Sequence, residues 1–187
     1  SCSFTVTVSD NENPTIACPA NIAVNNDAGV CGAVVTYSVS SADNCAGSSV
    51  AQTAGAASGS TFSVGTTTNS FTVTDASGNT ASCSFTVTVS DNENPVITCP
   101  ANISVNNDAG VCGAVVQYGV SATDNCPGVG TAQTAGSASG STFSVGTTTN
   151  SFTATDASGN TASCSFTVTV TDNENPIIAC PANISVN

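Results

Sequence analysis

The residues of this chain best suited to chemistry are acidic, and they recur at fixed positions. Asp and Glu together number 12, while Lys, Arg and His are absent. No carboxylate can therefore pair with a cationic side chain of its own chain. Hard oxygen ligands without a competing cation suit Ca²⁺, which takes about six to eight of them. The composition predicts a calcium site, and the alternative is that the Asp side chains only cap turns.

The predicted calcium ligands form two sets, one repeat length apart. In a β-sandwich with the expected order of strands, the turns that carry each set fall at the same end of one domain. No EF-hand spacing supports the metal. We expect an ion bound here to stiffen a joint and not to act as a cofactor. The first set is Asp10, Glu12, Asp43 and Asp75, and the second is Asp91, Glu93, Asp124 and Asp156.

The same composition argues against an enzyme. Serine and threonine are abundant, but no His or Lys is present to activate a hydroxyl nucleophile. A paired-carboxylate hydrolase is formally open, yet these acids recur in every repeat, which is more typical of a structural role. A net charge of −12 disfavours nucleic acid and anionic membranes as partners. No apolar run reaches the roughly 18 residues of a membrane span.

One period of 81 residues organises the chain. Residues 1–81 align with residues 82–162 without a gap and with 68 identities. This repetition predicts two complete domains, residues 10–90 and 91–171. Residues 1–9 are predicted to be the last strand of a preceding repeat, and residues 172–187 the first strand of a following one.

Alternation of apolar and polar residues indicates β-strands with one buried face. It is clear at Phe85–Val89 and again at Val35–Val39. Shorter apolar pairs indicate further strands: Phe62 with Val64, Phe71 with Val73, and Ile22 with Val24. Turns rich in Gly, Asn and Asp separate them. About seven short strands per repeat predict an all-β fold, a tandem array of immunoglobulin-like antiparallel β-sandwiches.

Four cysteines recur in each repeat, as Cys18, Cys31, Cys45, Cys83 and as Cys99, Cys112, Cys126, Cys164. An even number in a small domain predicts two disulfides per domain and an oxidising compartment, either extracellular or at the cell surface. A zinc site is disfavoured, because the chain has neither a CxxC pair nor a histidine. The expected core of Val, Ile and a few Phe is thin, so two disulfides would supply much of the stability of each domain.

Four cysteines allow three pairings. If residues 33–39 form one extended strand, Cys31 and Cys45 lie at its opposite ends and cannot meet, since a disulfide needs Cα atoms within about 7 Å. Of the two pairings that remain, we favour Cys18–Cys45 with Cys31–Cys83. The counterparts in the second repeat are Cys99–Cys126 with Cys112–Cys164.

Two sequons for Asn-linked glycosylation are present, at Asn102 and Asn183. The first repeat lacks the sequon, because Ala23 stands where Ser104 and Ser185 complete it. Dense Ser and Thr residues could instead carry O-linked sugar, and their alternative role is a soluble β-surface.

Several motifs, in a fixed order, resemble the hyalin repeat. They are DNENP at 91–95, ITCPANI at 97–103, CGAVV at 112–116, TDNCP at 123–127 and TDASGNTASCSF at 155–166. The first repeat departs from them at Ala46, where the second has Pro127. The resemblance implies an extracellular, immunoglobulin-like adhesive module, in a large surface or fibre protein of bacterial type.

Two functions are compatible with these observations. The first is a structural array, a filament or fibre in which repeated domains give length and the partner is another copy or a neighbouring repeat. The second is an adhesin that binds a glycan or another cell's surface through the repeats. Near-identity of the two repeats favours the structural array, because a dedicated binding site is usually confined to one specialised domain.

Overall fold

A computed structural model describes residues 1–185 of the chain. Its contacts divide the chain between Glu93 and Asn94 into two compact units. The described residues contain strands and turns, and none of them forms a helix long and apolar enough to cross a membrane. The predicted all-β class is confirmed.

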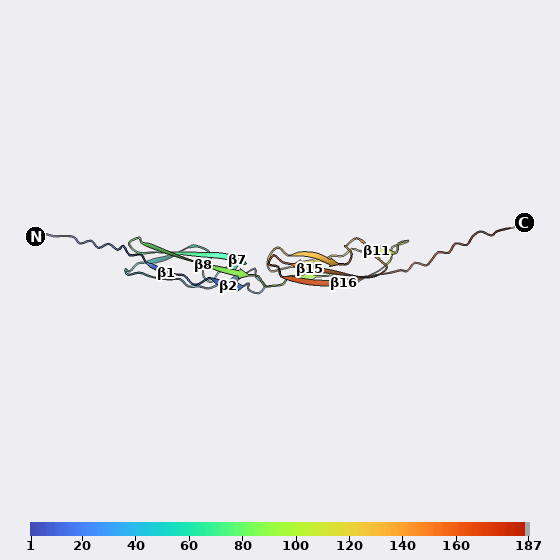
Figure 1. The fold of residues 1–187 in the computed structure, drawn as a ribbon, viewed down its shortest axis with the longest axis horizontal. Helices are drawn as coiled ribbons and strands as arrows, with labels where there is room; N and C mark the ends of the chain where they lie inside the picture. The colour runs from blue at the N-terminus through green and yellow to red at the C-terminus, as the bar shows by residue number, and fades with distance from the viewer. Residues whose placement is uncertain (186–187) are drawn as a thin grey trace. The chain divides into compact units, whose positions relative to one another are not determined.

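The first unit is built from eight strands. They are β1 (Thr15–Ala17), β2 (Ile22–Asn25), β3 (Gly32–Val34), β4 (Ser40–Ala42), β5 (Ser49–Ala54), β6 (Thr61–Ser63), β7 (Gly65–Thr74) and β8 (Thr80–Ser90). Four of these form one sheet in the order β2-β8-β7-β5, in which β2 runs parallel to β8 and the other pairs are antiparallel. The remaining strands form two antiparallel pairs, β1 with β4 and β3 with β6. The long β7 and β8 run along the unit (Figure 1).

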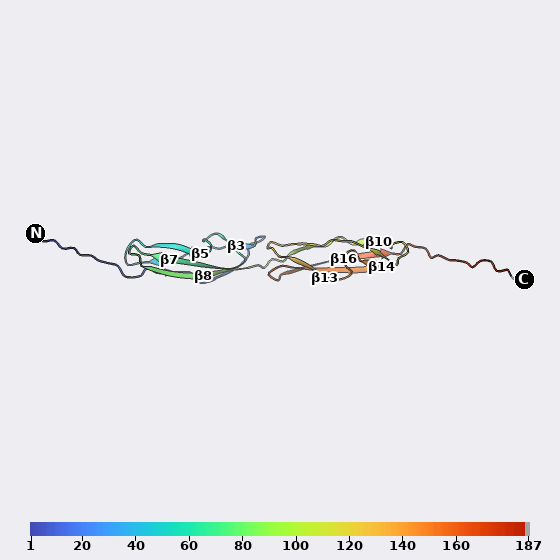
Figure 2. The same cartoon turned by 90° about the horizontal axis from the view of Figure 1, so that it is seen from above.

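The second unit repeats this arrangement. Its strands are β9 (Val96–Thr98), β10 (Ile103–Asn106), β11 (Gly113–Val115), β12 (Ser121–Thr123), β13 (Gly130–Ala135), β14 (Thr142–Ser144), β15 (Gly146–Thr155) and β16 (Thr161–Thr171). The large sheet has the order β10-β16-β15-β13, and the pairs are β9 with β12 and β11 with β14. Figure 2 shows the same strands from a second direction.

The core of each unit is small and follows the predicted alternation. Phe85, Val87 and Val89 on β8 are 3%, 0% and 2% exposed, while the Thr residues between them reach the surface. Tyr37 packs edge-on against Phe85, with ring centroids 4.9 Å apart. Phe62 is fully buried against the same cluster. The two-layer packing confirms the sandwich-like domains predicted from the sequence.

The strand predicted at residues 33–39 is only partly formed. Regular pairing ends at Val34, although Val35 and Tyr37 still turn toward the core. Val35 still bonds to the backbone, since Val35 N donates to Ser60 O at 3.3 Å and Gly59 N donates to Val35 O at 2.8 Å. At Tyr37 a serine side chain replaces the backbone partner, because Ser58 Oγ accepts from Tyr37 N at 2.8 Å and donates to Tyr37 O at 2.7 Å. The predicted burial of alternate residues is therefore confirmed, but the prediction of one regular strand through residue 39 is wrong.

The predicted first and last strands lie outside the sheets of both units. Residues 1–14 form no strand, and Phe4 is 89% exposed, whereas its counterpart Phe85 is buried. Residues 172–185 likewise form no strand. Their assignment to neighbouring repeats stays a prediction, and Val186 and Asn187 lie outside the described residues.

Candidate functional site

Three of the predicted acidic residues meet at one end of the first unit. Asp10 lies just before β1, Asp43 follows β4, and Asp75 follows β7. One carboxylate oxygen of each lies within 4.8 Å of the others. Pairing of β1 with β4 brings the first two turns together. These three aspartates are called the first acidic cluster below.

Turn capping uses only part of these carboxylates. Asp10 Oδ1 accepts a hydrogen bond from Glu12 N at 3.0 Å, and Asp43 Oδ2 accepts one from Cys45 N at 3.2 Å. The other oxygens, Asp10 Oδ2 and Asp43 Oδ1, are buried and receive no hydrogen bond from nitrogen or oxygen. A buried carboxylate oxygen without a donor is costly, and a bound cation would remove that cost.

Asp75 is held ionised by its own turn. Burial alone would raise the pKa of this carboxyl group, but hydrogen bonds outweigh burial and lower the pKa from its usual value of 3.8. Asn79 Nδ2 donates to Oδ2 at 2.7 Å, while Asn79 N and Ser77 N donate to Oδ1 at 2.8 and 2.9 Å. Bonds to the charged form favour it. Asp156 has the same set of donors in the second repeat, and its pKa is lowered for the same reasons.

The Cys45 thiol lies beside the first acidic cluster. A hydrogen bond to Asp10 and the negative charge of that carboxylate raise the pKa of the thiol, and Asp43 and Asp75 add to the effect. Because the thiolate is the reactive form of cysteine, this environment keeps Cys45 a poor nucleophile. The sequence reasoning treated Cys45 only as a disulfide partner. Its position two residues after Asp43 is the signal that could have placed it here.

In the second repeat the corresponding group is Asp91, Asp124 and Cys126, whose ligand atoms lie within 4.8 Å of one another. Asp124 Oδ2 accepts from Cys126 N at 2.9 Å, and Asp124 Oδ1 is buried without a hydrogen-bond partner. Cys126 is disulfide-bonded, so its sulfur is no thiolate ligand. Asp156 does not belong to this group. The predicted set of four is therefore only partly brought together.

The two predicted glutamates have other partners. Glu12 Oε2 accepts from Asn44 Nδ2 at 3.0 Å. Both oxygens of Glu93 lie against Gly29 N, at 2.8 and 3.1 Å. Gly29 belongs to the turn after β2, at the end of the first unit opposite to Asp10. Neither glutamate lies in a group of converging ligand atoms, so the prediction that they share one site with the aspartates is not supported.

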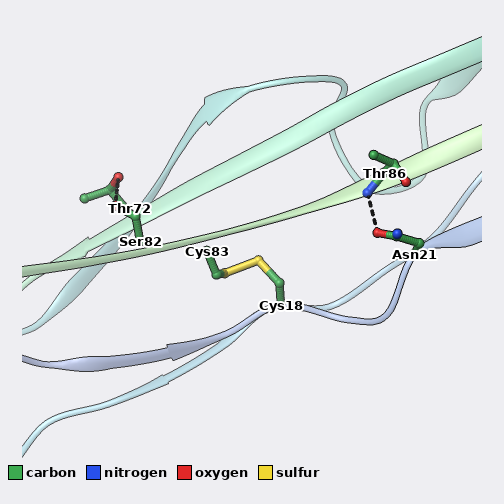
Figure 3. Close-up of a disulfide and its surroundings, with 6 residues drawn as sticks. All are labelled: Cys18, Asn21, Thr72, Ser82, Cys83 and Thr86. Carbon is green, nitrogen blue, oxygen red and sulfur yellow. Dashed lines mark hydrogen bonds between the residues drawn. A yellow bond between two sulfur atoms is a disulfide. The ribbon is translucent and has the colours of Figure 1, made fainter.

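The disulfides differ from the favoured pairing. Cys18 bonds to Cys83 and Cys99 bonds to Cys164, with Cα atoms 5.8 and 5.9 Å apart. Figure 3 shows Cys83 on β8, with Cys18 reaching it from the segment between β1 and β2. The predicted bonds Cys18–Cys45, Cys31–Cys83, Cys99–Cys126 and Cys112–Cys164 are therefore wrong.

The prediction of two disulfides within each domain is corrected as well. Cys45 and Cys112 are exposed thiols. The elimination failed because it assumed that all four cysteines pair within their own repeat. Cys31 and Cys45 do lie apart, as expected, but this does not prevent Cys18 from bonding to Cys83.

The sequon at Asn102 coincides with a structural asparagine. Asn102 Oδ1 accepts from Thr167 N at 2.9 Å, as Asn21 Oδ1 accepts from Thr86 N at 2.9 Å in the repeat that lacks the sequon (Figure 3). The asparagine thus joins the start of one strand to its neighbour whether or not a sequon is present. Asn183 is exposed. Glycosylation at both positions stays a prediction.

Comparisons with known proteins support the resemblance seen in the motifs. Hyalin of Strongylocentrotus purpuratus is 35% identical over 192 aligned positions, which cover 98% of this chain and 16% of hyalin. The relative is a sea-urchin protein, and the comparisons do not support the expected bacterial type.

Similar solved structures include extracellular cadherin domains 1–5 of protocadherin gamma B2, at 14% identity and a TM-score of 0.45, covering 90% of this chain and 42% of that one. Mouse cadherin-23 domains 22–24 give 13% identity and a TM-score of 0.39, covering 86% and 67%. The model of the HYR domain matches residues 9–89 and 90–170. The chain belongs to the HYR domain family, with two tandem copies.

Proposed function

We propose that this chain is a segment of an extracellular structural array, in which repeated β-sandwiches add length to a filament. The observation that carries the proposal is the position of the two ends of a repeat. The N-terminal end of the repeat lies beside the start of β8, because Asp10 O accepts a hydrogen bond from Asn79 Nδ2 at 3.2 Å. Asn79 is the residue directly before β8. At the other end, Asn26 N donates to Ser90 O at 2.8 Å, where β8 ends.

A repeat built this way extends the chain. Strand β8 has 11 residues, and at about 3.3 Å per residue it separates the two ends by roughly 33 Å. The chain enters at one end and leaves at the other, so each added repeat contributes length. The internal disulfides support an oxidising, extracellular setting. Identity at 68 of 81 positions supports a common mechanical role for the repeats over a specialised catalytic or binding domain.

Electron microscopy of the native material tests the array. Filaments whose thickness matches a single domain are the expected result. Compact isolated particles would contradict the proposal. If such particles bind glycans or cell surfaces, the adhesin takes its place.

The proposal includes calcium at the N-terminal end of each repeat. The proposed ligands in the first repeat are Asp10, Asp43 and Asp75, and those in the second repeat include Asp91 and Asp124. The support is the pair of buried oxygens Asp10 Oδ2 and Asp43 Oδ1, which receive no hydrogen bond from nitrogen or oxygen, together with the absence of Lys, Arg and His from the sequence. A divalent ion would relieve the repulsion between these carboxylates and stiffen the turns that carry them.

Unfolding of the whole chain by urea, in chelator and in millimolar Ca²⁺, tests this site. An ion at 100 times its Kd stabilises the native state by about 2.7 kcal/mol. We expect a chain with Asp10→Asn and Asp43→Asn to lose the calcium response of the first repeat. Glu12→Gln, which removes a charge outside the cluster, should retain it. Equal stability of the unmodified chain in both buffers would rule out the ion.

A further inference from the structure

The last residues of the first repeat lie parallel to a segment near its start. Strand β2 pairs with β8 in parallel over its four residues. Just before this ladder, Asn21 Oδ1 accepts a hydrogen bond from Thr86 N at a sequence separation of 65 (Figure 3). The Cys18–Cys83 disulfide has the same sequence separation of 65. The disulfide therefore continues the register of the parallel pair toward its start.

Further hydrogen bonds extend this pairing beyond the end of β8. Asn26 N donates to Ser90 O at 2.8 Å, and Asn26 Oδ1 accepts from Asn92 N at 3.1 Å. Glu93 Oε1 then accepts from Gly29 N at 2.8 Å. The end of the repeat is thus held by its own early residues on both sides of the ladder. The two segments, residues 21–29 and 86–93, are called the parallel clamp below.

The second repeat contains its own parallel clamp. Strand β10 pairs with β16 in parallel. The side-chain bonds recur with the same lengths: Asn102 Oδ1 accepts from Thr167 N at 2.9 Å, Asn107 Oδ1 from Asn173 N at 3.1 Å and Glu174 Oε1 from Gly110 N at 2.8 Å. Because each unit forms these bonds internally, the clamp belongs to the repeat itself.

The path of the chain determines how tension acts on the parallel clamp. The chain enters the repeat beside the start of β8 and leaves it past the end of β8. Tension therefore pulls the residues before β2 and the residues after β8 in opposite directions, along two parallel segments. Such segments part by sliding, which loads all of their bonds together, whereas a hairpin that is peeled open breaks one bond at a time. Strand β2 is an edge strand whose neighbour in the sheet is β8, so this pairing is what holds it there.

The disulfide decides whether the parallel clamp carries the load. Cys18 and Cys83 lie just before the two segments, so the bond ties these segments together where they begin. With the bond in place the segments cannot slide, and tension passes from Cys18 to Cys83 and along β8, which is already extended. Without the bond, the path from Cys18 onward runs through β2 and the clamp.

We propose that the parallel clamp is a second load-bearing device, which holds a repeat together under tension when its Cys18–Cys83 or Cys99–Cys164 disulfide is open. The inference rests on the structural array proposed above, in which tension runs along the chain. A dithiol opens the bond: the disulfide takes up two electrons and two protons and becomes two thiols, while the dithiol becomes a disulfide. A repeat in this state resists unfolding through its clamp instead of lengthening at low force.

Single-molecule stretching of the whole chain in dithiothreitol tests the clamp. Asn26→Ala with Asn107→Ala removes the side-chain acceptor of Asn92 N and of Asn173 N, one in each repeat. We expect these variants to unfold at a lower force than the unmodified chain while releasing the same length, because forced unfolding depends on the barrier to sliding. Asn21→Ala with Asn102→Ala, at the start of each clamp, should lower the force as well.

Thr72→Ala with Thr153→Ala is the matched control, because each removes a hydroxyl hydrogen bond between the antiparallel strands outside the clamp. Its unfolding force in dithiothreitol should equal that of the unmodified chain. Without dithiothreitol, the clamp variants should also unfold at the unmodified force, since the disulfides prevent sliding.

Two results would overturn the inference. Either the clamp variants unfold at the unmodified force in dithiothreitol, or they lose as much force without dithiothreitol as with it. The readout comes from single chains and is independent of filament shape. A native material without filaments would therefore contradict the array and leave the force measurement on the clamp unchanged.

Discussion

Asn69 is a polar residue at a core position, and the glycine beside it explains why. Asn69 lies on β7 with its side chain fully buried, and Gly55 packs against it with φ of 89°. Gln52 Nε2 approaches Asn69 Oδ1 at 3.4 Å, next to the irregular pairing between Gln52 and Ala54. In the second repeat, Ser137 N donates to Asn150 Oδ1 at 2.9 Å. The buried amide therefore holds the chain where the edge strand leaves the sheet.

We expect Gly55→Ala to destabilise the first repeat by about 2–4 kcal/mol. An added Cβ would meet the Asn69 side chain and backbone, and the positive φ adds about 1 kcal/mol of strain. Gly59→Ala is the matched control, because its φ is 82° but nothing lies within 4 Å of the added Cβ. It should cost only about 1 kcal/mol. Equal losses in urea unfolding would show that the close packing at Asn69 contributes nothing.

The turns at Asp75 and Asp156 predict loss of stability in acid. The pKa of each carboxyl group is lowered in the folded state, below 3.8. The unfolded state therefore binds the proton more readily. The stabilisation is present above the unfolded pKa and is lost as the pH falls through the folded pKa. We expect Asp75→Asn with Asp156→Asn to flatten the acid limb of a plot of unfolding free energy against pH.

At the scale of the elements, the sequence predicted the strands that build the core and missed those on the surface. Phe85 to Val89 alternates strictly, because one face of β8 is buried and the other is wet. Strand β5 is exposed along its whole length, so it carries no such alternation, and β1 and β4 have three residues each. Their strand character comes from pairing with neighbours, which local sequence does not encode.

The candidate site, like the strands, was predicted only in part. The turns of Asp10, Asp43 and Asp75 were placed at one end because three strand ends meet there, and the structure brings them together. The Glu12 and Glu93 side chains were misplaced, since the sequence does not show which backbone donors lie within their reach. The prediction of the disulfide pairing was wrong for a similar reason, because the pairing depends on distances between strands that the sequence does not show.

We expect removal of the Cys18–Cys83 disulfide to cost about 4 kcal/mol. The bond closes a loop with a sequence separation of 65 residues, and the chain-entropy model gives this value for a loop of that size. The measurement is urea unfolding of a chain with Cys18→Ala and Cys83→Ala. Cys45→Ala is the control and should cost less than about 0.5 kcal/mol, because that thiol is exposed. A loss as small as that of the control would mean that the core alone stabilises the repeat.

At the scale of the whole molecule, the disulfides determine how far a pulled chain can lengthen. The load passes from Cys18 directly to Cys83 and from Cys99 directly to Cys164. Between these bonds, only the stretch from Cys83 to Cys99, a sequence separation of 16, bears the force. Fully extended, this stretch spans about 55 Å. An unfolded repeat in the oxidised chain would thus remain short, which suits the proposed structural array.

Single-molecule stretching of the chain, tethered at its two ends, measures this limit. Without reductant, we expect each unfolding event to release only the short stretch between disulfides. With reductant, each event should release a further 65 residues, about 220 Å, because the loop closed by Cys18 and Cys83 opens. A chain with Cys18→Ala and Cys83→Ala should give the long step in the first repeat alone, without any reductant. Long steps in the oxidised, unmodified chain would show that its repeats are not held by these bonds under load.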